Sequence, residues 1–170
     1  VPAAEPRVGH YVKYDAGVVI SASHNPYQDN GIKVFSGKGE KFTEAVERHV
    51  EAIVADRSWH AKSGDPSPVP RADLIDAYLG HLRAVFPESS EVRGFCLAID
   101  CANGATTTVA PKLFNALGLD TIVMGDTPDG RNINLGCGST HPEKLAALVV
   151  ERGCQLGVAF DGDGDRAIFV

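Results

Sequence analysis

The chain has 170 residues, of which 44% are apolar and 22% are charged, and its net charge at pH 7 is −6. This composition is typical of a soluble globular protein. The acidic balance and the lack of a basic run argue against a nucleic-acid partner or an anionic membrane surface. No stretch of about 18 apolar residues occurs, so we expect no membrane-spanning helix.

The start of the sequence carries neither the basic segment nor the apolar segment of a signal peptide. The four cysteines show no C-x-x-C pattern or other spacing typical of metal ligands. We therefore expect reduced, partly buried thiols and a cytoplasmic location. The thiols concerned are those of Cys96, Cys101, Cys137 and Cys154.

The first 60 residues combine two short strands with one helix. Gly17–Ser21 is a β-branched run that predicts a buried strand, and Gly31–Ser36 alternates in polarity like a second strand. A turn rich in Asn, Asp and Pro separates them. Thr43 is a good N-cap for a helix of about 13 residues, whose first turn is suited by the acidic Glu44 and Glu47.

Residues 61–72 predict a linker because they contain a glycine and three alternating prolines. A helix is expected over Asp73–Phe86, where Pro87 stops it. Strands and helices then alternate in β-α-β-α-β order, which implies a parallel sheet with right-handed crossovers. The expected strands are Phe95–Asp100, Thr121–Met124 and Leu156–Phe160, and the helices are Thr107–Leu117, ending at Gly118, and Pro142–Glu151, ending at Gly153.

The expected fold class is α/β, with two α/β/α units that contain mixed or parallel sheets. The first unit, residues 1–60, is an incomplete domain, and the second, residues 73–170, is the β-α-β-α-β domain. The sequence does not begin with Met and stops on an apolar strand, Ala167–Val170. We therefore expect it to be a segment of a longer protein.

The stretch D-G-D-G-D-R, which begins at Asp161, is a candidate metal site at the carboxyl end of an expected strand. Glycines between Asp161, Asp163 and Asp165 let the backbone curl so that three carboxylates converge on a hard cation such as Mg²⁺. A solvated acidic turn is the alternative. An EF-hand calcium loop would need glycine where Arg166 stands. Arg166 beside a metal indicates a bound anion, most simply a phosphate.

The stretch S-A-S-H-N-P, which begins at Ser21, places the hydroxyl of Ser23 in a tight polar turn. A serine nucleophile needs activation by a base or, as a phosphoserine, by a metal. A purely structural serine is the alternative, and a Ser/His/Asp hydrolase is disfavoured because no G-x-S-x-G surrounds Ser23. Lys33 is a further candidate, or else a surface lysine. Neither a P-loop nor a G-x-G-x-x-G that opens a helix occurs, so nucleotide binding has no support.

Together and in this order, the two motifs resemble those of the α-D-phosphohexomutase superfamily. The stretch G-I-K-V-F-S, from Gly31 onward, is also similar to that superfamily. Three further stretches resemble the bacterial phosphoglucosamine mutase subfamily. They are D-C-A-N-G-A-T at 100–106, G-D-T-P-D-G at 125–130 and N-I-N-L-G-C-G-S-T-H-P-E at 132–143. The likeness runs from Asp15 to Val170, whereas residues 1–14 match poorly.

The resemblance implies that Ser23 is a phosphorylated nucleophile. One of its phosphate oxygens would bind a single Mg²⁺ together with the carboxylates of Asp161, Asp163 and Asp165. Arg166 would contact the phosphate.

Two more roles follow from the resemblance. His24 would act from the same S-A-S-H-N-P loop as Ser23, and Lys33 would be an acid–base or phosphate-positioning residue. The implied reaction interconverts glucosamine 6-phosphate and glucosamine 1-phosphate through a bisphosphate, which also serves as activator, in a protein that forms a homodimer. A phosphomannomutase or phosphoglucomutase, and a non-catalytic magnesium-binding fragment, are the alternatives.

Overall fold

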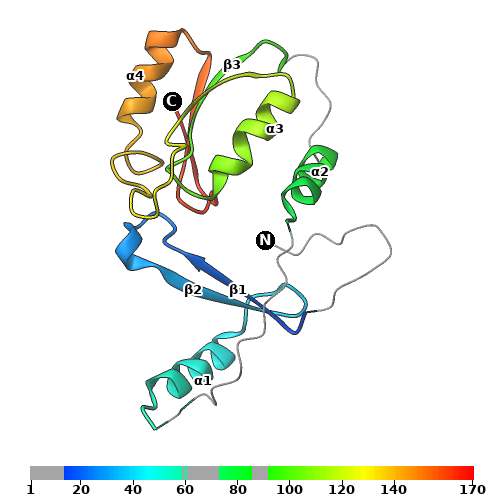
Figure 1. The fold of residues 1–170 in the computed structure, drawn as a ribbon, viewed down its shortest axis with the longest axis vertical. Helices are drawn as coiled ribbons and strands as arrows, with labels where there is room; N and C mark the ends of the chain where they lie inside the picture. Colours follow the sequence, from blue (N-terminus) through cyan, green and yellow to red (C-terminus); the bar gives the residue numbers. More distant parts are fainter. Residues whose placement is uncertain (1–13, 59, 61–72, 86–91) are drawn as a thin grey trace. The chain divides into compact units, whose positions relative to one another are not determined.

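A computed structural model describes residues 14–58, 60, 73–85 and 92–170 (Figure 1). The chain divides into two compact units. One consists of Val1–Val19 and Lys33–Leu74, and the other of Ile20–Ile32 and Ile75–Val170. The expected linker at 61–72, the stop at Pro87 and residues 1–13 lie outside the described residues.

Two strands and a helix dominate the described N-terminal part, as predicted. The prediction that the first strand is buried is wrong, because Val18 and Ile20 are 63% and 70% exposed. Strands β1 (Ala16–Ser21) and β2 (Gly31–Ser36) pair in a two-stranded sheet, and helix α1 spans Glu44–Ala55. Thr43 precedes α1 in an extended conformation, and its carbonyl accepts the Glu47 N–H at 2.9 Å. None of the α1 side chains is buried, so the apolar face of this helix remains open to solvent.

The second unit contains a four-stranded sheet in the order β4-β3-β5-β6. Strand β3 (Cys96–Asp100) pairs in parallel with β4 (Asp120–Met124) and with β5 (Leu156–Phe160). Strand β6 (Ala167–Phe169) adds to β5 in antiparallel orientation, which makes the sheet mixed. The helices of this unit are α2 (Ile75–Val85), α3 (Ala110–Ala116) and α4 (Glu143–Arg152). No helix in the described ranges is long and apolar enough to cross a membrane.

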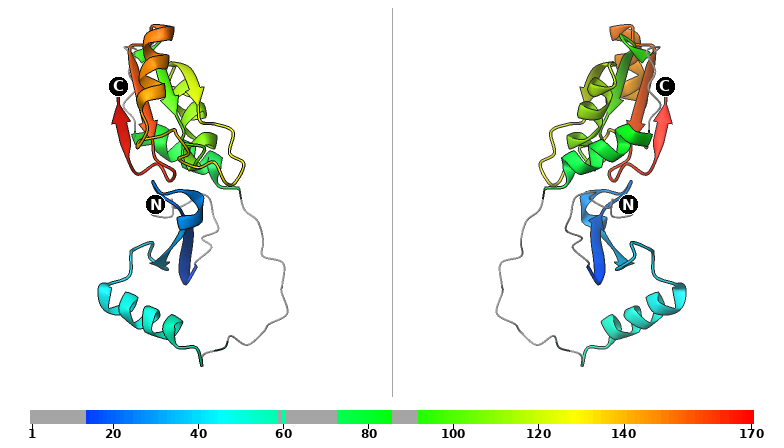
Figure 2. Two further views of the ribbon diagram at one scale, coloured as in Figure 1. Left: turned by 90° about the vertical axis from the view of Figure 1, so that its left-hand side faces the viewer. Right: turned by 90° about the vertical axis from the view of Figure 1, so that its right-hand side faces the viewer.

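Helices α3 and α4 cover opposite faces of this sheet (Figures 1 and 2). On one face, Leu97 and Ile99 of β3 pack with Phe114 of α3. On the other face, Ala98 of β3 packs with Leu145 of α4. Because successive side chains of a strand point to opposite faces, β3 contributes to both layers of the core. The unit is therefore the α/β/α domain that the sequence predicts.

The prediction of one helix over Thr107–Leu117 is wrong in its first turn. A 3₁₀ turn, η3 (Ala105–Thr108), comes first, and α3 begins at Ala110. The hydroxyl of Thr107 donates to the Gly104 carbonyl at 2.7 Å, and such local bonds compete with α-helical pairing. Pro111 has no N–H and therefore suits the first turn of the helix that follows.

The prediction of reduced thiols is wrong for Cys96 and Cys154, which the structure joins in a disulfide. Cys96 begins β3 and Cys154 lies just before β5, so the register of two adjacent strands places their Cα atoms 4.7 Å apart. This separation lies within the usual range for a disulfide. Cys101 and Cys137 are free and buried.

The two free cysteines should resist alkylation in the folded protein. Burial raises the pKa of the Cys101 thiol to about 11 and also raises the pKa of Cys137. At pH 8 only about one Cys101 in a thousand is then a thiolate, the reactive form. Mass spectrometry after iodoacetamide treatment should find both residues unmodified in native protein and modified in guanidinium chloride. Rapid labelling of the native protein would contradict this expectation.

Candidate active site

Ser23 lies in the turn that follows β1, and its backbone adopts an unusual conformation. Its φ angle is 51°, a left-handed value that is uncommon for residues other than glycine. The Ser23 N–H donates to Ser21 Oγ at 3.0 Å. The Ser23 carbonyl accepts the Gly162 N–H at 3.0 Å and the Asn134 amide at 2.8 Å. Such a backbone costs about 1–3 kcal/mol and persists only where its surroundings impose it.

Three carboxylates converge at the carboxyl end of β5. One oxygen atom from each of Asp161, Asp163 and Asp165 lies within 4.8 Å of the other two. Asp161 is fully buried, Asp163 is half-buried and Asp165 is exposed. Gly164 makes the turn possible, because its φ is 73° and its N–H donates to the Asp161 carbonyl at 3.1 Å.

The charge on this cluster is unfavourable without a counter-ion. Burial raises the pKa of Asp161, and the neighbouring carboxylates of Asp163 and Asp165 raise it further against the lowering effect of the Arg166 N–H. A bound cation would relieve the repulsion between the three carboxylates. Because every donor is an oxygen atom, the cluster is a candidate site for a hard divalent cation.

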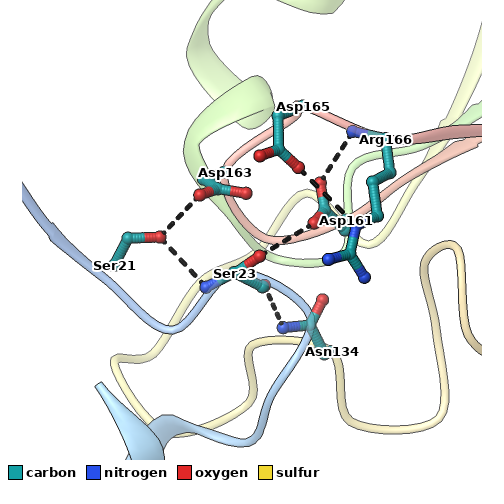
Figure 3. Close-up of polar contacts among 7 residues, drawn as sticks. All are labelled: Ser21, Ser23, Asn134, Asp161, Asp163, Asp165 and Arg166. Carbon is teal, nitrogen blue, oxygen red and sulfur yellow. Dashed lines mark hydrogen bonds and ion pairs between the residues drawn. The ribbon is translucent and has the colours of Figure 1, made fainter. Parts of the chain in front are cut away.

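The serine loop (residues 21–26) and the acidic loop (residues 161–166) meet in the second compact unit (Figure 3). Ser23 Oγ donates to Asp161 Oδ2 at 3.3 Å, across 138 positions of the sequence. Ser21 Oγ donates to Asp163 Oδ2 at 2.9 Å, across 142 positions. The structure therefore brings the Ser23 hydroxyl to the carboxylate cluster, and both motifs contribute to one site.

Gly162 lies where the two loops touch. A Cβ atom at this position would overlap the Ser23 carbonyl oxygen, and it would lie 2.7 Å from Ile133 Cδ1 and 3.0 Å from Asn134 Nδ2. We expect Gly162→Ala to lower the free energy of unfolding by about 1–3 kcal/mol, because a backbone atom must move to make room. Urea unfolding measures this change.

Gly80→Ala is the matched control, because a Cβ on Gly80 of α2 meets no atom within 4 Å. This exchange should leave stability unchanged or raise it slightly, since alanine is the better helix former. Equal stabilities of the two variants would show that the loops tolerate a side chain at Gly162.

The other predicted site residues are placed differently. The Arg166 N–H donates to Asp161 Oδ1 at 3.2 Å, and its Nε lies 3.9 Å from Asp165 Oδ1 in an exposed ion pair. Nδ1 of His24 is buried and has no hydrogen-bond partner among the described residues. Lys33 lies on β2 and is assigned to the other compact unit, so its role stays a prediction.

Sequence reasoning missed two residues that shape this site. Asn134 donates to the serine loop, and Asp100 is fully buried at the end of β3. The Asp100 carboxylate accepts the N–H groups of Ala102 at 2.9 Å and Gly138 at 2.7 Å. The sequence gives a weak signal for Asn134, because asparagine tolerates left-handed backbone and its φ is 58°.

Comparison with known protein families agrees with this arrangement. Residues 1–61 match phosphoglucomutase/phosphomannomutase alpha/beta/alpha domain I, and residues 76–170 match alpha/beta/alpha domain II. The chain belongs to the phosphoglucomutase/phosphomannomutase family. The resemblance in the motifs is thereby confirmed. The expectation that residues 1–14 match poorly is wrong, because the domain I match begins at residue 1. The domain I match contains the serine loop, and the domain II match contains the acidic loop.

Curated family members named phosphoglucosamine mutase are similar to this chain. The protein of Xanthomonas campestris pv. campestris (strain B100) is 48% identical over 159 residues, and that of Xylella fastidiosa (strain M23) is 49% identical over 158. Each of these alignments covers 92% of this chain and 35% of the relative. The Caldicellulosiruptor saccharolyticus protein is 41% identical over 172 residues, covering 97% and 38%. The chain thus spans little more than a third of these relatives' length.

Solved structures of the family share the fold. A phosphoglucomutase/phosphomannomutase family protein from Burkholderia thailandensis superposes with a TM-score of 0.72 at 28% identity, covering 100% of this chain and 36% of that one. A structure from Thermus thermophilus superposes with a TM-score of 0.73 over 94% of this chain and 37% of its own, at 24% identity. The predicted α/β fold class is therefore confirmed.

Proposed function

We propose that the protein carrying this chain is a phosphohexomutase that interconverts glucosamine 6-phosphate and glucosamine 1-phosphate. One observation carries the proposal: Ser23 Oγ lies 3.3 Å from Asp161 Oδ2, in a loop that touches three converging carboxylates. Membership of the phosphoglucomutase/phosphomannomutase family supports the reaction type. Relatives that are named phosphoglucosamine mutase at 48% and 49% identity support the amino sugar as substrate.

In the proposed reaction, Ser23 Oγ carries a phosphoryl group and donates it to a hydroxyl of the sugar monophosphate. The bond between phosphorus and Ser23 Oγ breaks as the sugar oxygen bonds to phosphorus. The sugar hydroxyl proton passes to a base, and the departing Ser23 Oγ takes up a proton, which it releases when it is phosphorylated again. The sugar bisphosphate then reorients, and its other phosphoryl group returns to Ser23. The two transfers therefore balance, and the serine is phosphorylated again at the end.

Asp161, Asp163 and Asp165 would hold Mg²⁺ with an oxygen of the phosphoserine. The ion would neutralise charge on the transferring phosphoryl group, which is the main requirement of this chemistry. The hydrogen bond from Ser23 Oγ to Asp161 supports these roles, because it joins the proposed nucleophile to a proposed ligand.

Three more residues have proposed roles. Arg166 binds the phosphate, which its largely exposed guanidinium can reach. His24 accepts or returns the sugar proton, and the support for this role is the buried Nδ1 atom without a partner among the described residues. Lys33 acts as an acid–base or phosphate-positioning residue, a role suggested by its charge and its place in the G-I-K-V-F-S stretch.

The remaining features of the proposal concern the whole protein. The domain boundaries would follow the sequence prediction, with domain 1 over residues 1–60, a linker over 61–72 and domain 2 over 73–170. The protein would be a cytoplasmic homodimer with a hexose or glucosamine bisphosphate as activator, and without nucleic-acid or membrane partners.

The test uses protein expressed from the complete reading frame, with Mg²⁺, glucosamine 6-phosphate and a catalytic amount of glucosamine 1,6-bisphosphate. We expect formation of glucosamine 1-phosphate and one phosphoryl group per chain, about 80 Da by intact mass. A higher kcat/KM for mannose or glucose phosphates would instead assign a phosphomannomutase or phosphoglucomutase. No turnover of any hexose phosphate and no phosphoserine would favour the non-catalytic alternative.

A further inference from the structure

Asn134 lies in the loop between β4 and α4, outside both motifs. It is 9% exposed, and its φ angle of 58° falls in the left-handed region. Its backbone N–H donates to the Ala102 carbonyl at 2.9 Å, which ties the residue to the segment after β3. This bond anchors the backbone of Asn134 beside the carboxyl end of β3, and the side chain projects from there.

Both N–H donors of the Asn134 side chain bond to the serine loop. Nδ2 donates to the carbonyl of Ser23 at 2.8 Å and to the carbonyl of Asn25 at 2.8 Å (Figure 3 shows the first bond). Carbonyl oxygens only accept, so the NH₂ end of the amide must face them. Aspartate has the same shape but no donor, and serine or threonine has only one. Of these side chains, only the amide of asparagine can donate to both carbonyls.

These two bonds hold the peptide plane before His24 and the peptide plane after Asn25. The Ser23 carbonyl belongs to the peptide that enters His24, and the Asn25 carbonyl belongs to the peptide that leaves Asn25. The Ser23 N–H is itself held by Ser21 Oγ at 3.0 Å, so the peptides before and after Ser23 are both fixed and its φ of 51° is retained. The Gly162 N–H, 3.0 Å from the same Ser23 carbonyl, brings the acidic loop into this arrangement.

We propose that Asn134 is a positioning residue, whose amide holds the Ser23 nucleophile and His24 in register with the carboxylate cluster. This inference rests on the proposed phosphoryl transfer from Ser23. Because misplacement of reacting groups by about 1 Å can cost a factor of about 10² in rate, loss of the amide should lower kcat more than it alters substrate binding.

The experiment uses the protein expressed from its complete reading frame, in three variants. Asn134→Asp keeps shape and tolerance of left-handed backbone but removes both donors. Asn134→Gly keeps the backbone conformation and removes the side chain. Asn115→Asp is the matched control, because Asn115 is exposed on α3 and its Oδ1, which accepts from the Thr121 hydroxyl, has a counterpart in aspartate.

Five quantities are measured: kcat and KM for glucosamine 6-phosphate, the melting temperature, the ³¹P signal of the phosphoserine, and hydrogen exchange of the peptides that contain Ser23 and Gly162. We expect both Asn134 variants to lose about 10²-fold in kcat with KM within about two-fold. The ³¹P signal should shift, exchange should quicken in both peptides, and the folded fraction should be unchanged. Asn115→Asp should match the wild type in every readout.

Each other result overturns the inference. Unchanged kcat in both Asn134 variants rejects the positioning role, whatever the exchange data show. A loss of kcat that equals the loss of folded protein reduces Asn134 to a structural residue. If the wild type shows no mutase turnover, the proposed function fails separately. Hydrogen exchange then tests separately whether Asn134 holds the serine loop. Exchange rates that are the same in the Asn134 variants and the wild type would reject that role as well.

Discussion

Ser23→Ala is expected to abolish mutase turnover, with a loss of at least ~10⁴-fold in kcat, as is usual when a nucleophile is removed. The hydroxyl of Ser23 points to Asp161 Oδ2 at 3.3 Å, and no other hydroxyl in the described residues donates to that carboxylate. Intact-mass measurement should find the wild type about 80 Da heavier than its sequence mass, and the variant at its sequence mass.

Ser58→Ala serves as the matched control, since Ser58 bonds only to the exposed carboxylate of Asp56 among the side-chain hydrogen bonds of the described residues. It should retain both the phosphoryl group and turnover. A phosphorylated or active Ser23→Ala protein would show that another residue carries the phosphoryl group, and phosphopeptide mapping would then identify it.

Asp161→Asn is expected to weaken Mg²⁺ binding by about 10²-fold or more and to lower kcat by a similar or larger factor. The exchange keeps the size of the side chain and removes one of three carboxylate charges from the cluster. Asp161 is the fully buried member, so solvent cannot replace its contribution to the ion. Titration calorimetry with Mg²⁺ and steady-state turnover measure the two effects.

The same variant should be at least as stable as the wild type when Mg²⁺ is absent. Burial raises the pKa of Asp161, which means that folding disfavours its ionised form. Removing that charge therefore raises the melting temperature of the metal-free protein and removes the further rise that Mg²⁺ produces. Asp120→Asn, at the exposed start of β4, is the control and should alter neither quantity. A Mg²⁺-dependent rise of normal size in Asp161→Asn would exclude Asp161 as a ligand.

Much of the second unit could be predicted from local sequence because its elements follow local rules. The apolar runs that form β3 and β5 predict buried strands, and Gly153, with a φ of 64°, ends α4 as expected. The division of the Thr107–Leu117 helix could not be read in this way. It depends on which carbonyl the Thr107 hydroxyl meets, and that is decided by the turn at Gly104.

The pairing of Cys96 with Cys154 shows the same limit. Their spacing in the sequence matches no disulfide or metal pattern, and only the register of β3 against β5 brings them together. The buried Asp100 is a second case, because its partner at Gly138 lies 38 positions away in a loop without regular structure.

The sequence by itself determined the family of this protein and the residue types of its candidate site. Three alternating carboxylates predict a cation site, a loop serine is a candidate nucleophile, and the two motifs together identify the family. Tertiary structure alone decided how the parts meet: Ser21 on Asp163, Ser23 on Asp161, and the Asn134 amide across two carbonyls of the serine loop. The reason is physical. A short motif shows which side chains are present. Contacts across more than 100 positions depend instead on loop conformations that the whole sheet holds in place.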